Sequence, residues 1–236
     1  MIDFHTHILP GMDDGASTPA ESLALLREER RQGVRHVFLT PHFYGDEESP
    51  AEFLRRRAAS FAELKAVLST APEKETLPAL HLGAEVYYFP GLSDCAELLP
   101  LSMGQTGCLL IEPPMAPWSA SLLEDIEAVG SNLRLVPVIA HVDRYCRLLG
   151  DDALFERIAE RKILIQVNAS FFLRGDSSEA AMERLERGAV HFLGSDCHRL
   201  PERGPNLGEA ARRVSDAGHA AALKNLMEKN RRLLNG

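Results

Sequence analysis

Two histidines separated by a single residue, His5 and His7, close the first apolar segment of the chain. Side chains alternate along a β-strand with a period of two residues, so both imidazoles are expected on one side of the strand. Two imidazoles placed in this way could bind the same metal ion. Because paired histidines are equally common at surfaces and in satisfied cores, other ligands must decide whether a metal binds here.

Several later apolar segments also end in an ionisable residue. The residues at these ends are His42, Glu85, Glu112, His141, Asp196 and His198. In an α/β barrel the carboxyl ends of the strands converge on one face, where the active site is built. Burying this many charges together without a cation is costly, which favours metal coordination over a satisfied polar core.

The ligand types restrict the metal. Histidine and carboxylate ligands without thiolates suit manganese, iron or zinc rather than calcium or a structural zinc finger. Asp14, Glu85, Glu112 and Asp196 would supply four negative charges, and three divalent ions would leave the centre positive. A phosphate dianion would then be attracted to a chain whose overall net charge is −8.

Seven short apolar segments read as β-strands with helical patterns between them. Capping boxes at Thr18 and Ser49 predict two helix starts, and Gly33 is expected to end the first helix. Strands that alternate with helices imply parallel pairing, which fits a barrel or an open doubly wound sheet. The expected strands lie near Ile2–His5, Val34–Thr40, Ala79–Glu85, Gly107–Glu112, Arg134–Ala140, Ile163–Asn168 and Val190–Gly194.

The composition is that of an ordinary globular protein with one domain. The chain has 236 residues, of which 45% are hydrophobic and 25% charged. We expect no membrane span, since no apolar run is long enough, and no nucleic-acid partner, since the arginines form no basic stripe. The N-terminus has no secretory signal pattern, and the four cysteines form no Cys-x-x-Cys pair, so a cytoplasmic protein with reduced thiols is expected.

Short motifs in a characteristic order add a family resemblance. The chain resembles the polymerase-and-histidinol-phosphatase (PHP) family over its whole length, and within it the bacterial manganese-dependent tyrosine-protein phosphatases of the capsular polysaccharide type. The motifs are His5-x-His7, Asp13-Asp14-Gly15, Thr40-x-His42, Gly83-Ala84-Glu85-x-Tyr87-Tyr88, Ile111-Glu112, Val138-Ile139-Ala140-His141-x-x-Arg144-Tyr145, Gln166-Val167-Asn168 and Ser195-Asp196-x-His198.

The resemblance implies one domain over residues 1–236, folded as a distorted (β/α)7 TIM-like barrel with three metal ions, manganese being favoured over iron or zinc. It implies phosphate-binding roles for Arg144 and Arg203, while Asn168 lines the site with its role open, and Asp13 remains an alternative to Asp14. The implied metal sites are His5, His7, Glu85 and Asp196; then Glu85 (bridging), Glu112 and His141; then Asp14, His42 and His198.

The resemblance also implies an activity. It is the hydrolysis of phosphotyrosine by attack of a metal-bound hydroxide, with a bacterial tyrosine kinase that regulates exopolysaccharide synthesis as the expected protein partner. Two alternatives remain open at this point. One is a small-molecule phosphatase such as histidinol phosphatase, and the other is a non-catalytic metal-binding scaffold.

Some residues imitate functional sites. Cys197 and Arg203 have the Cys-x5-Arg spacing of cysteine-dependent phosphatases, but they lack the glycine-rich phosphate loop, so we expect Cys197 to point away from the metals. Asp3 has the parity of His5 and either supports its imidazole or is structural. We interpret four histidines outside the pattern as structural or surface residues: His36, His81, His191 and His219.

Aromatic residues follow several of the proposed ligands. They form either a rim that receives a phosphotyrosine ring or plain loop packing. The four tyrosines concerned are Tyr44, Tyr87, Tyr88 and Tyr145.

Overall fold

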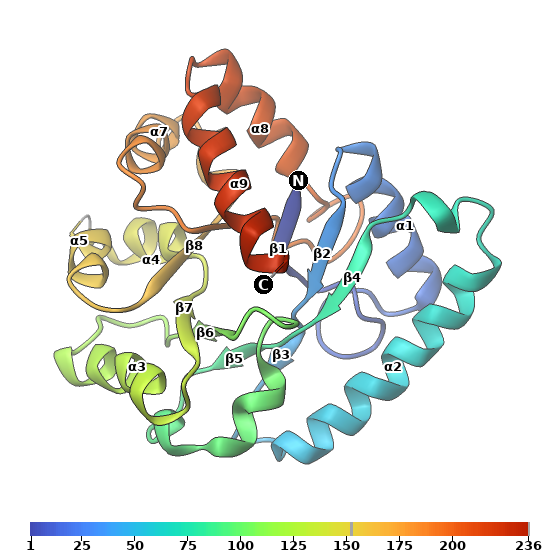
Figure 1. The fold of residues 1–236 in the computed structure, drawn as a ribbon, viewed down its shortest axis with the longest axis horizontal. Helices are drawn as coiled ribbons and strands as arrows, with labels where there is room; N and C mark the ends of the chain where they lie inside the picture. Colours follow the sequence, from blue (N-terminus) through green and yellow to red (C-terminus); the bar gives the residue numbers. More distant parts are fainter. Residues whose placement is uncertain (152, 236) are drawn as a thin grey trace.

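The computed structural model describes residues 1–151 and 153–235, so the last residue of the expected domain, Gly236, lies outside the described part. Parallel strands form the centre of the molecule, and helices surround them (Figure 1). Within the described ranges the strands are β1 (Ile2–Thr6), β2 (His36–Leu39), β3 (His42–Phe43), β4 (Ala79–Leu82), β5 (Glu85–Tyr87), β6 (Cys108–Glu112), β7 (Val136–Ile139), β8 (Leu164–Asn168) and β9 (Phe192–Gly194).

Two of the predicted strands are interrupted in the middle. The segment predicted at 34–40 forms β2 and is followed, after Thr40 and Pro41, by β3; the one predicted at 79–85 breaks at Gly83 and Ala84 into β4 and β5. The chain nevertheless keeps its direction, because Gly83 N donates to Leu39 O at 2.9 Å and Glu85 N donates to Pro41 O at 3.0 Å. The strand orders β1-β2-β4 and β3-β5-β6-β7-β8-β9 are therefore successive parts of one curled sheet.

The far end of this sheet returns to its start. Asp196 N, just after β9, donates to His5 O at 2.8 Å, and His7 N donates to Cys197 O at 2.9 Å. An open doubly wound sheet would keep its two edges apart. The fold is accordingly an α/β, partial TIM-like barrel, as predicted.

The helices begin at the predicted caps. Thr18 Oγ1 accepts from Glu21 N, and Ser49 forms a complete capping box with Glu52, whereas the Glu21 carboxylate accepts from Ser17 N instead of closing the first box. The α-helices are α1 (Pro19–Arg31), α2 (Pro50–Thr70), α3 (Ala120–Asn132), α4 (Val142–Leu149), α5 (Leu154–Ala159), α6 (Ser170–Leu173), α7 (Ser178–Glu186), α8 (Leu207–Asp216) and α9 (Ala220–Asn235), and short 3₁₀ turns cover Lys74–Thr76, Leu92–Asp94 and Ala96–Leu101.

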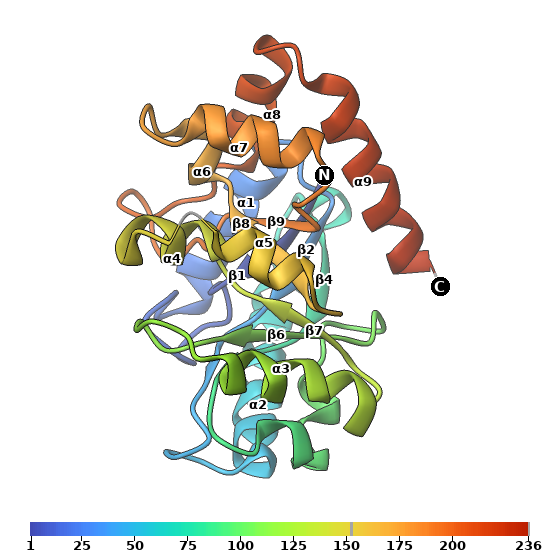
Figure 2. The ribbon, with the colours of Figure 1, turned by 90° about the vertical axis from the view of Figure 1, so that its left-hand side faces the viewer.

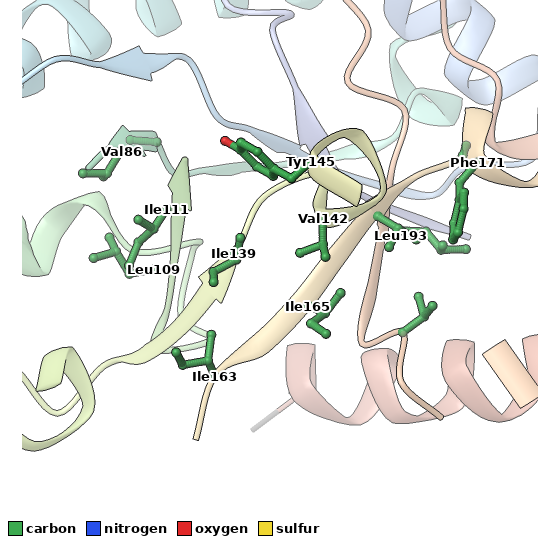
Figure 3. Close-up of a cluster of buried hydrophobic side chains, with 14 of the residues drawn as sticks. Val86, Leu109, Ile111, Ile139, Val142, Tyr145, Ile163, Ile165, Phe171 and Leu193 are labelled. Atoms are coloured by element: carbon green, nitrogen blue, oxygen red, sulfur yellow. The ribbon is translucent and has the colours of Figure 1, made fainter. Parts of the chain in front are cut away.

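Apolar side chains fill both sides of the curled sheet. The larger cluster lies between the strands and the helices that cover them, and Figure 3 shows Ile111, Ile139 and Ile165 of successive strands in it. A smaller cluster lies inside the barrel and includes Phe4, Phe38 and Phe192. The Phe4 ring is 4.9 Å from that of Phe38 and 4.5 Å from that of Phe192, measured between centroids. This packing supports the strands from below the ends that carry the ionisable residues.

Strand β1 contains an irregularity that the sequence does not reveal. Asp3 pairs with Val37 and Thr6 with Leu39, so three steps along β1 correspond to two along β2. An extra residue of this kind is a β-bulge, and it changes which side chains share a face. The expected common parity of Asp3 and His5 therefore does not hold.

No helix in the described part of the chain combines the length and the apolar character that a membrane span requires.

The helices gather at two ends of the molecule. Figure 2, turned by 90° from Figure 1, shows α7, α8 and α9 at one end and α2 and α3 at the other.

Candidate metal centre

The predicted ligands meet around one buried carboxylate. Glu85, at the start of β5, has Oε2 at 2.9 Å from His5 Nε2 and Oε1 at 2.8 Å from His141 Nε2. His7 Nε2 lies 3.3 Å from Glu85 Oε2, and His42 Nδ1 lies 3.1 Å from the same atom. Glu85 thus lies where four imidazoles from three strand ends converge.

The other carboxylates surround this centre. Glu112 has Oε1 at 3.3 Å from His141 Nε2, and Asp196 has Oδ1 at 3.4 Å from His7 Nε2. Asp14 is the most exposed member, with 66% of its side chain accessible, and its Oδ1 lies 3.3 Å from His198 Nε2. All nine sequence-predicted ligands are therefore brought together.

The candidate ligands form three sets, and within each set the ligand atoms lie within 4.8 Å of one another. They differ in part from the predicted division. His7 joins the outer set, Glu85 is absent from the set of His5, and His42 takes the place of His141 beside Glu85 and Glu112. The sets found among the described residues are His7, Asp14, His42 and His198; His5, His7 and Asp196; and His42, Glu85 and Glu112.

The geometry of these donors fits metal ions better than a hydrogen-bonded core. His5 Nε2 and His7 Nε2 face each other at 3.1 Å. His42 Nδ1 and His198 Nε2 are buried and form no hydrogen bond, although carboxylate oxygens of Glu85 and Asp14 lie 3.1 and 3.3 Å away. Buried polar atoms in native proteins are normally paired, so converging unpaired nitrogens indicate a cation as their partner. The donor set of imidazoles and carboxylates suits a transition-metal ion.

Two of the ligand positions have a backbone that non-glycine residues rarely adopt. His141 has φ 32° and Asp196 has φ 54°. Such conformations persist only where the surrounding structure enforces them, and they gather at functional sites. Here they turn both side chains into the cluster immediately after β7 and β9.

Two residues orient the ligands, Asp13 and Gln166. His7 Nδ1 lies 2.7 Å from Asp13 Oδ2, and Gln166 Oε1 accepts from His141 N at 2.5 Å and lies 3.3 Å from His5 Nδ1. Outer partners of this kind fix the tautomer and the direction of a metal-binding imidazole. Gln166 was quoted only as part of a motif, although its parity with Asn168 on a strand ending at the site is a signal that could have identified it.

The predicted alternative of Asp3 as a partner of the His5 imidazole is wrong. Asp3 Oδ1 accepts from the backbone N of His5 at 3.1 Å and from the backbone N of Ser195 at 3.0 Å. The bulge in β1 separates the two side chains, so Asp3 holds the backbone of two ligand-bearing segments instead. For the choice left open between Asp13 and Asp14, Asp14 Oδ1 lies 3.8 Å from His42 Nε2 and 3.3 Å from His198 Nε2, while Asp13 Oδ2 lies 2.7 Å from His7 Nδ1.

The sequence-predicted substrate residues lie beside the cluster. Arg144 and Arg203 both donate to Asp196 Oδ2, the latter at 2.7 Å, and Asn168 Nδ2 donates to the same oxygen at 3.0 Å. These residues line a cavity of about 700 Å³ next to the metal-ligand set. Asp143, which the sequence analysis did not single out, accepts from Asn168 N at 2.8 Å and from Arg174 at 3.1 Å.

The members of the cluster shift one another's pKa values in different directions. Burial would raise the pKa of Glu85 and Asp196, but the positive field of His5 and its neighbours holds both well below their ordinary range. Burial would lower the pKa of His141, yet the Glu112 and Glu85 carboxylates raise it to about 9. For His198, burial and the charge of His7 lower the pKa to about 4. Glu85 and Asp196 are therefore ionised at neutral pH.

Two of the residues outside this set behave as structural groups. Cys197 is fully buried, its Sγ donates to the Glu29 carboxylate, and burial with the nearby acids raises its pKa well above the ordinary value. Such a thiol is a poor nucleophile. Tyr145 does not belong to an aromatic rim, because it is fully buried and its hydroxyl donates to Pro113 O.

The four histidines interpreted as structural or surface residues also contact groups outside the cluster. His36 Nδ1 lies 3.1 Å from His81 Nε2, His191 Nδ1 accepts from Ile165 N, and His219 Nδ1 lies 2.8 Å from Glu186. His191 precedes β9 instead of lying inside it, which corrects the predicted strand boundary.

Comparison with known proteins agrees with this geometry. The family model for capsular polysaccharide synthesis proteins of the CpsB/CapC type matches residues 1–235. The chain belongs to this family. The family resemblance expected from the motifs is thereby confirmed.

Individual CpsB/CapC relatives match over most of their length. The tyrosine-protein phosphatase CpsB of Streptococcus agalactiae is 35% identical over 228 residues, covering 89% of this chain and 88% of the relative. The tyrosine-protein phosphatase YwqE of Bacillus subtilis is 31% identical over 219 residues, covering 89% of this chain and 82% of the relative.

A solved structure also matches. It comes from work on YwqE from Bacillus subtilis and CpsB from Streptococcus pneumoniae, described as unique metal-dependent tyrosine phosphatases. It has a TM-score of 0.84 and 26% identity, and covers all of this chain and 94% of its own. The chain therefore shares the fold of a metal-dependent tyrosine phosphatase.

Proposed function

We propose that the chain is a metal-dependent protein-tyrosine phosphatase in which the histidine and carboxylate cluster holds the metal ions. The observation that carries the proposal is the meeting of nine candidate ligand side chains, eight in the three sets and His141 beside Glu85 and Glu112, next to two arginines in one cavity. Relatives named tyrosine-protein phosphatases over nearly the whole chain support it.

The proposed metal content is three divalent ions, most favourably manganese. Nine side chains offer enough donors for three sites if Glu85 bridges two of them, and Glu85 does present a different oxygen to His5 and to His141. Residues assigned as ligands are His5, His7, Asp14, His42, Glu85, Glu112, His141, Asp196 and His198. When bound, such ions lower the pKa of coordinated water towards about 7 and neutralise charge on phosphoryl oxygens.

The chain's own residues then bind and orient the phosphate. Arg144 and Arg203 converge on Asp196 from the cavity side, so their remaining N–H groups are placed to contact phosphoryl oxygens beside the metal ligands. A planar guanidinium recognises phosphate with two parallel hydrogen bonds, which fixes its orientation. Asn168 holds the Asp196 carboxylate in place, a positioning role.

Tyr44 and Tyr87 are the aromatic residues placed to contact the substrate ring. Their rings are 5.6 Å apart, and the ring of Tyr44 is 5.4 Å from that of His42. Both are only partly buried, in contrast to Tyr145. An aryl phosphate entering the site would meet these rings, which favours phosphotyrosine over a phosphorylated alcohol.

The biological partner proposed is a phosphotyrosine-containing bacterial tyrosine kinase that regulates exopolysaccharide synthesis. Membership in a capsular polysaccharide synthesis family supports this choice. We place the reaction in the cytoplasm, because the four cysteines are far apart in the sequence and form no Cys-x-x-Cys pair, a pattern that suits a reducing compartment. The whole of residues 1–236 is proposed to act as a single PHP-type domain.

The test is substrate preference of the manganese-loaded protein. Turnover of a phosphotyrosyl peptide should exceed that of the same peptide with phosphoserine, and that of histidinol phosphate, by at least about tenfold in kcat/KM. A protein that prefers histidinol phosphate is a small-molecule phosphatase, and one that hydrolyses none of the three is not the proposed enzyme.

A further inference from the structure

A second cavity lies at the opposite end of the barrel from the metal ligands. Its volume is about 310 Å³, and it lies where β1 and β2 begin, against α8 and α9. Figure 1 shows α9 crossing the molecule beside the start of β1. The volume is at the lower end of the range of about 300–1,000 Å³ that is usual for small-molecule sites.

The wall of this cavity is apolar. Ile2 comes from β1, Leu193 from β9, and Leu207 and Leu226 from α8 and α9. All four side chains are buried in the fold. A ligand with an apolar body would therefore transfer its own hydrophobic surface from water to an apolar wall here.

One polar side chain on the wall lacks a partner. Asn230 of α9 lines the cavity and is only 7% exposed. No hydrogen bond joins its amide to another residue in the described ranges, and its polar atoms are not among the fully enclosed unpaired ones, so they remain accessible from the cavity. An amide on a cavity wall in this state offers a donor to a bound molecule.

The charged groups at the cavity are all positive. Arg35 and Arg231 line it, and among the residues that the structure describes neither forms an ion pair with a carboxylate. Burial lowers the pKa of the Met1 amine, and the charges of Arg231 and Arg35 lower it further, which is consistent with both guanidiniums lying near the same spot. His36 also lines the cavity, but its ring already contacts His81.

We propose that this cavity is a binding site for a small amphiphilic anion, separate from the metal centre. The apolar body would lie against Ile2, Leu193 and Leu226. The anionic group would bind Arg35 and Arg231 at the entrance, and Asn230 would donate a hydrogen bond to it. Paired arginines recognise carboxylates and phosphates by the same forked geometry, so the class is defined by its negative head and its apolar tail.

Octanoate is a suitable probe because it has both features. Calorimetric titration of the metal-loaded full chain should show one octanoate site, with octan-1-ol binding at least tenfold more weakly because it has no charge. Acetate has the carboxylate without the tail, so it reports any binding to the metal ions themselves and should not reproduce the octanoate signal. Hexyl phosphate, tested alongside, shows whether a phosphate head is preferred to a carboxylate.

Substitutions locate the site. The double variant R35Q/R231Q changes only exposed side chains, and it should weaken octanoate binding at least tenfold while leaving octanol binding unchanged. Asn230→Leu should weaken octanoate binding without altering the melting temperature by more than a few degrees. R232Q, an exposed neighbour on α9 that does not line the cavity, is the matched control and should bind octanoate like the parent chain.

Two results would overturn the proposal. One is the absence of octanoate binding in the parent chain at concentrations up to about 10 mM, tenfold above a Kd of about 1 mM. The other is octanoate binding that R35Q/R231Q leaves unaltered. Because binding is measured directly, neither outcome depends on whether the chain is a phosphatase.

Discussion

The Asp13 carboxylate and the His7 imidazole are joined at 2.7 Å, between Oδ2 and Nδ1. The same carboxylate accepts from the backbone N of Gly15 at 2.9 Å and of His42 at 3.0 Å. Burial opposes ionisation of Asp13, but the His7 charge and these donors hold its pKa far below the ordinary value. Asp13 therefore directs His7 Nε2 towards the cluster and fixes the backbone of a second ligand.

Asp13→Asn should weaken metal binding without removing a ligand. The loss of the carboxylate charge behind His7 is expected to lower manganese affinity by about 10–100-fold, as is usual for outer-shell substitutions. Titration of metal-free protein with Mn²⁺ measures this directly. Asp46→Asn, an exposed acid in the loop before α2, is the control and should bind like the parent; equal affinity in D13N would show that Asp13 has no orienting role.

Arg203→Lys should reduce catalysis while leaving the metal content unchanged. Lysine keeps the charge but not the forked geometry, and loss of a donor to developing charge commonly costs about 10²–10³ in rate. Steady-state kinetics on a phosphotyrosyl peptide, with metal analysis of the same sample, provide the measurement. Arg212→Gln on the exposed face of α8 serves as control. Full activity in R203K would exclude a bidentate contact to the phosphate.

Cys197→Ala should retain most of the turnover. The thiol is buried against Glu29, and its pKa is raised, so it supplies no thiolate at neutral pH. The expected effect is a modest loss of stability and a kcat within about threefold of the parent, since only a small buried group is removed. A loss of turnover in a folded, metal-loaded C197A would assign the chemistry to a cysteine nucleophile instead.

The metal-free chain should become less stable as the pH rises above neutrality. Burial would lower the pKa of His7 and His141, but neighbouring carboxylates raise it, to about 9 for His141. A raised folded-state pKa stabilises fully below the unfolded value of about 6.5 and loses this contribution as the pH rises through about 9. Urea unfolding of the chelated protein at pH 6, 7.5 and 9 tests this.

Metal-loaded protein provides the comparison for that experiment. Its stability should rise with pH over the same range, because protons compete with the metal for the imidazoles. Equal stability of the metal-free chain at all three pH values would mean that the neighbouring carboxylates do not stabilise the protonated forms of His7 and His141.

Most of the candidate ligands could be predicted from the sequence, because the carboxyl ends of the strands could be predicted from it. Apolar runs ending in His42, Glu85, Glu112 or His141 carry both the strand and its terminal side chain, and parallel strands bring those ends together without further information. The barrel and the ligand cluster therefore follow from local patterns combined with one topological rule.

The remaining features depend on contacts that no local pattern records. Alternation predicted Asp3 beside His5, but the bulge in β1 exists only in the pairing with β2. Asp13 and Asp14 are adjacent in one loop, and only the positions of His7 and His198 distinguish them. Tyr145 was grouped with the rim by its nearness to His141 in sequence, although the first turn of α4 directs it into the core.

The central claim is that His5, Glu85, His141 and Asp196 share metal ions that the reaction requires. The most direct measurement is metal analysis of the purified chain together with phosphotyrosyl-peptide turnover before chelation, after chelation and after manganese is restored. We expect more than one equivalent of divalent metal per chain, loss of turnover on chelation and its return with Mn²⁺. A folded chain without metal, whose turnover is unaffected by chelator and by added ions, would contradict it.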